Sequence, residues 1–327
     1  FEMHKSKNTD DCTVKLQFGI PRKFRSSERK EIEEESDLLK MPGNILIIGD
    51  PGAGKTTTLK RISRHTLFSE TELEKYHDYF PLLIKLRDIN TSIYVEIAKT
   101  LGFVVREVRK KITGKTTLFI GEVEHFIGDE KLDVVIPKLL NKSHILLLVD
   151  GLDELPREHK GQFESDFTKL GNKLTTSKII LTCRSGGYSH YIDGFTVLEI
   201  CPLEDFQINE IIQKWADEPE IFKSTLAKYP YSDLANRPLF LNQLIITFNY
   251  YGELPNQPSE VYERIINLML IQWDLHRKVR RKSKYADFKP EKKIKFLSAF
   301  AYNLTYKIKS KTFTKKDLIS TFQKIHN

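Results

Sequence analysis

Residues 44–48 read NILII, and the chain continues Gly49-Asp50-Pro51-Gly52-Ala53-Gly54-Lys55-Thr56-Thr57. The apolar run is typical of a strand buried on both faces, and the stretch after it fits G-x-x-x-x-G-K-[ST], the pattern of a phosphate-binding loop. Backbone N–H groups of such a loop curl round a phosphate, and a Cβ at its glycines would obstruct the curl. The helix expected from Lys55 points its positive end at the anion. We therefore predict that residues 49–57 bind a nucleoside polyphosphate.

Two side chains of this loop have specific expected partners. Lys55 would reach the β- and γ-phosphates, and the Thr56 hydroxyl would ligate Mg²⁺. A second apolar run, Ile145–Val149, ends in Asp150, which is the Walker B arrangement of an acid after a buried strand. We predict that Asp150 holds Mg²⁺ beside Thr56, through a water.

The residues after Asp150 depart from the common pattern, in which a catalytic glutamate follows at once. That position is Gly151, and two acids come later, Asp153 and Glu154. A carboxylate is needed to orient or deprotonate an attacking water, so both acids are catalytic candidates, with Asp153 slightly preferred. The alternative is that the pair merely ends a solvated loop.

A third motif is Lys178–Ser185 (KIILTCRS), an apolar strand that ends in polar groups. In an open parallel sheet, ligands bind at the carboxyl ends of the strands. Thr182 and Arg184 would then lie near the phosphates, with Arg184 as a catalytic candidate that steadies the γ-phosphate charge. The alternative for Arg184 is an ordinary surface ion pair.

The wider pattern predicts an α/β fold, because short apolar runs alternate with stretches of helical spacing up to Ile200. This order is typical of a parallel sheet with helices on both faces. Strands are expected at residues 14–18, 44–48, 80–86, 145–149, 178–182 and 197–200. After Pro202 the pattern is helical throughout, and residues 294–327 suggest a helix–turn–helix in which Thr314 and Asp317 cap the last helix.

Length, charge and cysteine content limit the classes of protein that fit these predictions. The 327 residues exceed one ordinary domain, and the net charge of +8 permits contact with nucleic acid without demanding it. We find no signal peptide and no apolar run long enough to span a membrane. Three cysteines, Cys12, Cys183 and Cys201, fit neither a disulfide scaffold nor a zinc site, so we expect a cytoplasmic protein. Because the sequence begins at Phe1, we expect a piece of a longer chain.

The three motifs, in this order, resemble those of the NACHT family of STAND P-loop NTPases. The hallmark is Asp150-Gly151-x-Asp153-Glu154, with a small residue after the metal-binding acid. Residues 182–185 look like the family's sensor 1, and residues 236–241 (NRPLFL) are similar to its N-x-P-L segment. By this resemblance Pro238 would contact the adenine base, and the ligands would be ATP or ADP with Mg²⁺.

The resemblance covers roughly residues 40–325 and implies an organisation into domains. It predicts a lead-in segment at 1–40, a P-loop NTPase domain of the ASCE or AAA+-like type at 41–203, an all-α helical domain at 204–288, and a partial winged-helix domain at 289–327. With its Lys-rich helices, the chain looks most like bacterial NACHT proteins, which typically act in antiphage defence and are related to the NLR receptors.

The function implied by the resemblance is a regulatory ATPase switch. ADP would hold the domains closed, and exchange for ATP would open them and allow self-association. Sensor and effector domains outside this chain would supply the trigger and the output, and hydrolysis would be slow.

Other functions stay open at this point. A nucleic-acid-dependent ATPase of AAA+ type would use the basic run at residues 277–284 and bind with a steep salt dependence. A scaffold with an uncleaved structural nucleotide is disfavoured by Asp153 and Glu154. A P-loop kinase is disfavoured because no acceptor-site motif is present.

Overall fold

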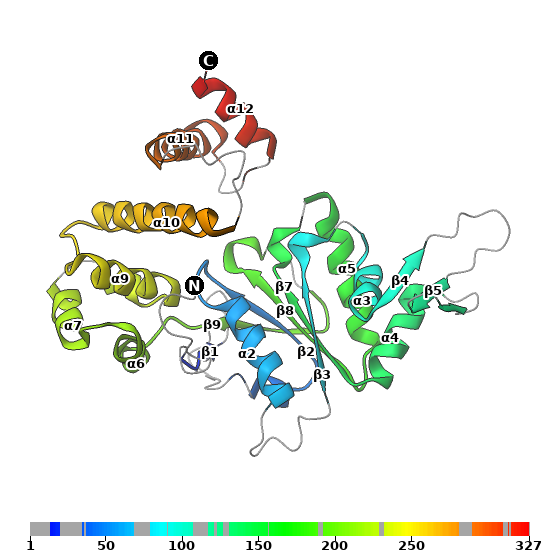
Figure 1. The fold of residues 1–327 in the computed structure, drawn as a ribbon. Coiled ribbons are helices and arrows are strands. Elements are labelled where there is room, and N and C mark those ends of the chain that lie inside the picture. The colour runs from blue at the N-terminus through cyan, green and yellow to red at the C-terminus, as the bar shows by residue number, and fades with distance from the viewer. Residues whose placement is uncertain are drawn as a thin grey trace. The chain divides into compact units, whose positions relative to one another are not determined.

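The computed structural model describes residues 14–19, 35, 37–68, 79–89, 91–106, 117–120, 123–126, 131–155, 157–188, 192–228, 232–280, 290–309, 313 and 315–326. The chain divides into two compact units (Figure 1). The first comprises Phe1–Pro219 and Ser232–Asn242, and the second comprises Glu220–Tyr231 and Gln243–Asn327. The predicted domain boundaries after residues 40, 203 and 288 stay predictions.

A six-stranded sheet forms the centre of the first unit, in the order β1-β9-β2-β8-β7-β3. Its strands are β1 (Phe18–Gly19), β9 (Phe195–Ile200), β2 (Asn44–Gly49), β8 (Lys178–Arg184), β7 (Ile145–Asp150) and β3 (Phe80–Lys85). All neighbouring strands pair in parallel except β1, which runs antiparallel to β9. The predicted parallel sheet is therefore confirmed, with one short antiparallel strand added at its edge.

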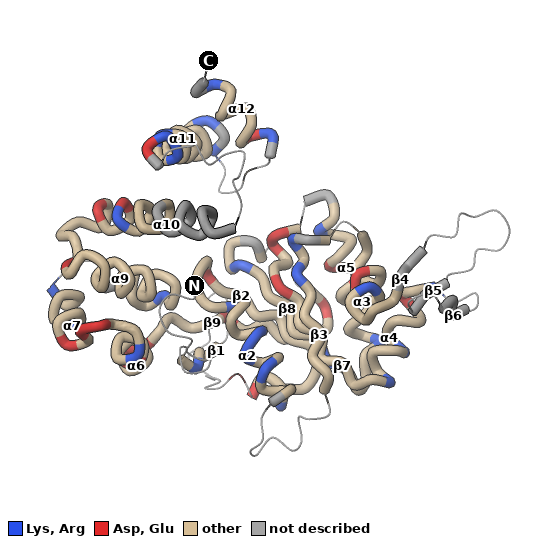
Figure 2. Tube along the Cα trace, in the orientation of Figure 1, with Lys and Arg blue, Asp and Glu red and all other residues tan. Residues whose placement is uncertain are grey.

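Helices cover both faces of this sheet, as the sequence predicted. Leu46 and Ile48 of β2 share a buried cluster with α3 (Ile93–Thr100), α4 (Leu132–Lys142) and α5 (Arg157–Lys173). The alternate residues of β2 face the other side, where α2 (Lys55–Phe68) contacts β2, β3, β7 and β8. Burial on both faces explains why β2 and β7 are apolar along nearly their whole length, and Figure 2 shows the charged residues mostly on the helices.

The parallel arrangement brings three sequence motifs to one edge of the sheet. Gly49 at the end of β2 is paired with Arg184 at the end of β8. Asp150 ends β7, the neighbour of β8 on its other side. This edge carries the candidate site, because the carboxyl ends of parallel strands lie together.

Two parts of the first unit differ from the sequence prediction. The strand expected at residues 14–18 is reduced to Phe18–Gly19, and residues 14–17 have no regular secondary structure. A small antiparallel sheet of β4 (Phe103–Arg106), β5 (Thr117–Ile120) and β6 (Val123–Phe126) was not expected. Each of these strands is only four residues long, too short for the periodicity of its side chains to be read.

The remaining described elements are helical, as predicted for the region after Pro202. The first unit ends with α6 (Asp205–Trp215) and α8 (Ser232–Ala235), and α9 (Pro238–Tyr251) continues from it into the second unit. Further helices are α1 (Asp37–Lys40), α7 (Pro219–Lys228), α10 (Pro258–Arg280), α11 (Pro290–Tyr302), a π-helix at Asn303–Ile308 and α12 (Lys315–His326). Thr314, the expected cap of α12, lies outside the described residues, as does the basic run beyond Arg280.

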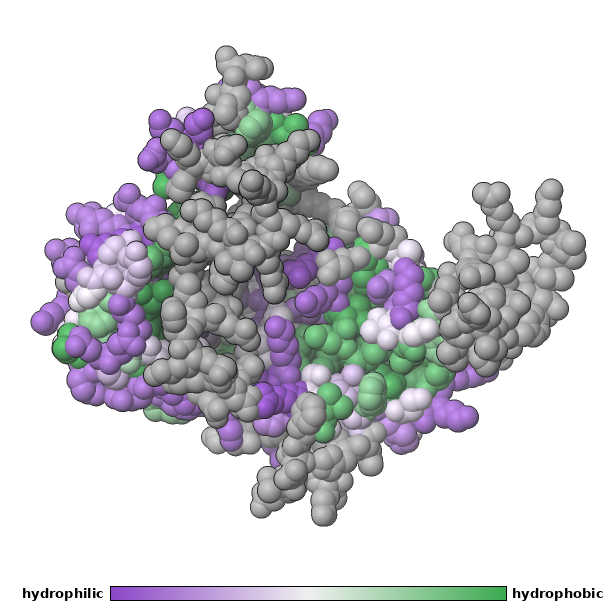
Figure 3. Space-filling model, viewed as in Figure 1, coloured by the Kyte–Doolittle hydropathy of each residue, from purple (hydrophilic) through white to green (hydrophobic). Residues whose placement is uncertain are grey.

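The surface of the first unit has an apolar area on the side shown in Figure 3, over the β3 and α3 region. Among the described helices, none combines the length and the apolar character that crossing a membrane requires.

Candidate functional site

The loop between β2 and α2 has a backbone that glycine adopts far more readily than other residues. Gly52 has a φ of +81° and Gly54 a φ of +105°, both on the left-handed side. A Cβ on Gly52 would lie 2.7 Å from the Leu239 Cβ, and one on Gly54 would lie 2.7 Å from the Leu16 Cδ1. Gly52 is therefore required both by its dihedral angle and by the Leu239 Cβ, whereas Gly54 is required by its dihedral angle, because the Leu16 Cδ1 is the end of a flexible side chain. Such a bare, curled backbone fits a phosphate group.

The other predicted loop residues have different surroundings. Asp50 and Pro51 are exposed, whereas Ala53 is buried and its N–H donates to the Asp50 carbonyl at 3.1 Å. Thr57 lies half-buried in the first turn of α2. The loop thus presents its backbone rather than its side chains, apart from Lys55 and Thr56.

Lys55 folds back over the loop that precedes it. Its Nζ donates to the Gly49 carbonyl at 2.7 Å and to the Asp50 carbonyl at 3.0 Å. Burial lowers the pKa of this ammonium, and the charge of Asp153 is the strongest influence that opposes the shift. Two neutral carbonyl oxygens hold the cation at the loop, and a negatively charged phosphate oxygen would bind it more strongly.

The Asp150 carboxylate at the end of β7 accepts hydrogen bonds from α2 and from β8. The Thr56 Oγ1 donates to Asp150 Oδ2 at 2.7 Å, and the Thr182 Oγ1 donates to Asp150 Oδ1 at 2.7 Å. The predicted proximity of Thr56 and Asp150 is thus present, although the two residues lie 94 positions apart in the sequence. Thr182 contacts Asp150 directly.

Asp153, Glu154 and Arg184 form an ion-pair group beside this carboxylate. Asp153 accepts from the Arg184 backbone N–H at 2.8 Å and from its Nε at 3.0 Å. Glu154 is farther from the guanidinium, with 3.8 Å between Oε1 and Nη2. Burial raises the pKa of Glu154, and the negative charges of Asp153 and Asp150 raise it further. Asp153 is thus engaged with Arg184, while Glu154 is the more loosely held acid.

Gly151 explains the unusual spacing of these acids. Its φ of +86° places it on the left-handed side, and a Cβ there would lie 3.0–3.2 Å from atoms of the Glu154 side chain. A glycine after Asp150 therefore lets the chain turn sharply and lets Glu154 fold back towards the end of β7.

The donor set at this edge fits Mg²⁺. Thr56 and Asp150 offer a hydroxyl and a carboxylate oxygen, and Mg²⁺ prefers oxygen ligands. Among the described residues, no group of three or more His, Cys, Asp or Glu side chains could hold a metal ion by itself. This agrees with the habit of Mg²⁺, which takes one or two protein oxygens and completes its shell with phosphates and water.

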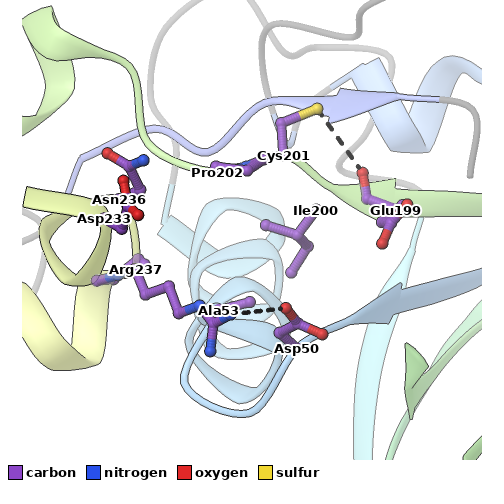
Figure 4. A pocket seen from close by; sticks show the side chains of 10 residues that line it. Asp50, Ala53, Glu199, Ile200, Cys201, Pro202, Asp233, Asn236 and Arg237 are labelled. Atoms are coloured by element: carbon purple, nitrogen blue, oxygen red, sulfur yellow. Dashed lines mark hydrogen bonds and ion pairs between the residues drawn. The ribbon is translucent and has the colours of Figure 1, made fainter. Parts of the chain in front are cut away.

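A cavity of about 160 Å³ opens next to the loop (Figure 4). Residues of the loop, of the end of β9 and of the turn between α8 and α9 line it: Asp50, Ala53, Glu199, Ile200, Cys201, Pro202, Asp233, Asn236, Arg237 and Pro238. The Arg237 side chain extends towards the loop, and its Nη2 lies 3.3 Å from Asp50 Oδ2. Pro238, the predicted base contact, therefore lines a cavity that adjoins the phosphate loop.

The start of α9 is also joined to the loop through the backbone. The Leu239 N–H donates to the Gly52 carbonyl at 3.3 Å. This contact, the Gly52–Leu239 packing and the Asp50–Arg237 ion pair tie one helix end to the loop.

A model of the NACHT domain family matches residues 44–219, more than half of the chain. The chain belongs to the NACHT domain family. The resemblance predicted from the P-loop and the Asp150 motif is thereby confirmed, and the NACHT match contains both motifs as well as Arg184. Pro238 lies beyond the matched residues.

Three solved structures are similar to this NACHT chain at low sequence identity. Aeropyrum pernix Orc1 in complex with DNA is 15% identical, with a TM-score of 0.44, and the match covers 87% of this chain and 72% of Orc1. A STAND protein with a tetratricopeptide repeat sensor from Pyrococcus horikoshii is 14% identical, with a TM-score of 0.44, over 81% of this chain and 36% of that protein. A Walker-type ATPase of Pyrococcus abyssi is 14% identical, with a TM-score of 0.43, over 89% and 86%. No curated protein matches.

Sequence reasoning missed several contacts of the site, among them the Leu239–Gly52 and Arg237–Asp50 contacts described above. It expected Thr182 near the phosphates but not bonded to Asp150; a polar residue within an otherwise apolar strand was the available signal. It missed Leu16 against Gly54, for which no local signal exists because residues 14–17 have no regular structure.

Proposed function

We propose that this chain is the nucleotide-controlled switch of a larger signalling or antiviral defence protein, of the STAND type. The switch binds ATP or ADP with Mg²⁺ and hydrolyses ATP slowly. Its nucleotide state controls the opening and self-association of the larger protein, to which sensor and effector domains are joined.

The observation that carries this proposal is the junction between the loop and α9. Leu239 donates to the Gly52 carbonyl and Arg237 pairs with Asp50, so a change of the loop on nucleotide binding acts on the start of α9. The helix continues past Asn242 into the second compact unit. A continuous helix is a stiff element, which supports a role for α9 in carrying the nucleotide state along the chain.

Binding begins with an exchange of partners at Lys55. Its ammonium would leave the Gly49 and Asp50 carbonyls for phosphate oxygens, because a negatively charged phosphate attracts the cation more strongly than a neutral carbonyl does. The loop N–H groups and the N-terminus of α2 add further attraction for the anion. Pro238 and its cavity are the proposed place of the base.

Thr56 and Asp150 are the proposed holders of Mg²⁺. The bound cation would neutralise the charge of the phosphates during hydrolysis.

Glu154 is our proposed general base, in preference to Asp153. Both oxygens of Asp153 already accept from Arg184, so this residue serves better as the support of Arg184. The raised pKa of Glu154 suits a group that must take a proton from water. Arg184, held by Asp153, is the proposed partner of the γ-phosphate charge.

The energy required of such a switch is moderate. Moving a population from 1:99 to 99:1 takes about 5.5 kcal/mol of preference for one state. A few charge-assisted contacts of Lys55 and Arg184 with the γ-phosphate, which ADP lacks, are of this order.

We propose the cytoplasm as the compartment. The three cysteines of the sequence, Cys12, Cys183 and Cys201, are an odd number and stand in no spacing typical of a disulfide scaffold or a zinc site, which supports a reducing compartment.

The binding step is tested by calorimetry with ATP and ADP and by mass spectrometry of the nucleotide that co-purifies. Lys55→Ala should lose ATP affinity by about a hundredfold or more, because the charged phosphate partner is gone. Lys60→Ala, on the exposed side of the same helix, is the control and should bind as the wild type. Equal affinity of Lys55→Ala and wild type would overturn the binding site.

The switching step is tested by hydrogen exchange over α9, with ADP and with a non-hydrolysable ATP analogue. The proposal predicts different exchange rates over Pro238–Tyr251 in the two complexes, accompanied by a change of molar mass in light scattering. Identical exchange and mass in both states would leave a nucleotide-binding protein without a switch and would contradict the proposal.

A further inference from the structure

Thr182 is a polar residue in the middle of a buried strand. Its neighbours Ile180, Leu181 and Cys183 are apolar, and Thr182 itself is 0% exposed. A buried hydroxyl costs free energy unless it finds hydrogen-bond partners. The partners of this hydroxyl therefore indicate what the residue does.

The direction of each hydrogen bond around Thr182 is fixed by chemistry. The Gly151 N–H can only donate, and it donates to Thr182 Oγ1 at 3.0 Å. The Thr182 proton is then directed to Asp150 Oδ1 at 2.7 Å. The other oxygen, Asp150 Oδ2, accepts from Thr56 at 2.7 Å. Two hydroxyls from β8 and α2 thus hold the two oxygens of one carboxylate.

We infer that Thr182 is a positioning residue that sets the affinity of this site for Mg²⁺ through Asp150. The inference rests on the proposed function, since it concerns the metal that accompanies the nucleotide. A carboxylate held at both oxygens is already oriented before a cation arrives, so little order remains to be imposed. Without the Thr182 hydroxyl, Asp150 keeps the bond from Thr56 to one oxygen and loses the bond to the other, and the Gly151 N–H is left without this acceptor.

The test measures Mg²⁺ affinity rather than turnover. Calorimetry of ADP binding, in EDTA and over a series of Mg²⁺ concentrations, gives the concentration at which Mg²⁺ exerts half of its effect. Thr182→Val removes the hydroxyl at nearly constant shape and should raise this concentration about tenfold or more, as loss of a supporting residue typically does. ADP affinity in EDTA should stay unchanged, because the phosphate loop is intact.

Two variants control the measurement. Thr182→Ser keeps the hydroxyl and should restore the Mg²⁺ requirement of the wild type. Thr247→Val makes the same change at another fully buried threonine, whose hydroxyl bonds to the Gln243 carbonyl within α9, and should leave it unchanged. If Thr182→Val does not fold, Thr182→Ala carries the same comparison.

An unchanged Mg²⁺ requirement in a folded Thr182→Val would overturn the inference. So would an equal loss of ADP affinity with and without Mg²⁺, because that pattern indicates general damage to the fold. Both outcomes leave the proposed function standing. A wild type that binds no nucleotide at any Mg²⁺ concentration would instead refute the proposed function.

Discussion

Two regions lie at the same sheet edge: the phosphate loop at Gly49–Thr56 and the acidic cluster at the ends of β7 and β8. They differ in the groups that they present to a ligand. The loop presents backbone, its Gly52 and Gly54 have positive φ angles, and Leu239 leaves no space for a Cβ on Gly52. The cluster presents side chains, and its hydrogen bonds join Asp150 to Thr56 and Thr182. The loop should therefore fail when atoms are added, whereas the cluster should fail when functional atoms are removed.

The largest expected effect comes from adding one methyl group to the loop. Gly52→Ala strains a backbone at φ +81° and brings a Cβ to 2.7 Å from Leu239. We expect ADP affinity to fall by about a hundredfold or more, because the N–H groups no longer converge on the phosphate. Calorimetry measures this loss.

Gly161→Ala is the matched control, since nothing lies within 4 Å of the added Cβ on α5. This variant should bind normally and gain about 1 kcal/mol of stability from helix propensity. Normal ADP binding by Gly52→Ala would contradict the expectation that added atoms disable the loop.

An effect of comparable size, on the rate of hydrolysis rather than on affinity, comes from removing charge in the cluster. Glu154→Gln should lower single-turnover hydrolysis by about 10²–10⁴-fold, the usual contribution of a general base, and keep nucleotide affinity. Asp153→Asn should have the smaller effect on the rate, because its carboxylate supports Arg184. The reverse order would make Asp153 the base.

A smaller effect is expected at the opposite end of β8, where a charged side chain is buried against backbone. Lys178 is 4% exposed, and its Nζ donates to the carbonyls of Leu38, at 2.7 Å, and Met41. Burial lowers the pKa of Lys178 from 10.5 to about 8. Between these values the unfolded chain binds more protons than the folded chain, so this group makes the protein more stable as pH rises.

Urea unfolding of wild type and Lys178→Met over pH 7–9.5 measures this contribution. The free energy of unfolding of the wild type should rise relative to the variant by up to about 1.4 kcal/mol per pH unit above pH 8. If the free energy of unfolding of the wild type and of the variant changed in parallel with pH, burial of the Lys178 charge would not destabilise the folded chain.

The smallest effect is expected at the ion pair between the loop and α9. Arg237 and Asp50 have side chains that are 45% and 51% exposed, and pairs of this kind contribute about 0–1 kcal/mol. Arg237→Ala should therefore change thermal unfolding little, because the Leu239–Gly52 backbone bond remains. A large destabilisation would mean that the ion pair, rather than the backbone bond, holds α9 to the loop.

The same contrast decides what the sequence could predict. The residues of the loop are consecutive in the sequence, and the strand at Asn44–Gly49 leads directly into them, so both were predictable. The contact of Thr182 with Asp150 depends on β7 and β8 becoming neighbours, which no local pattern encodes. The β4–β6 sheet was missed because each of its strands is only four residues long, too short to show a side-chain periodicity.

The most direct test of the central claim is a crystal structure of the chain with Mn²⁺ and a non-hydrolysable ATP analogue, using the anomalous signal of the metal. We expect phosphates against the backbone of Gly52–Thr56 and a metal peak beside the Thr56 hydroxyl and the Asp150 carboxylate. A saturated crystal in which the nucleotide or the metal lies elsewhere would contradict it.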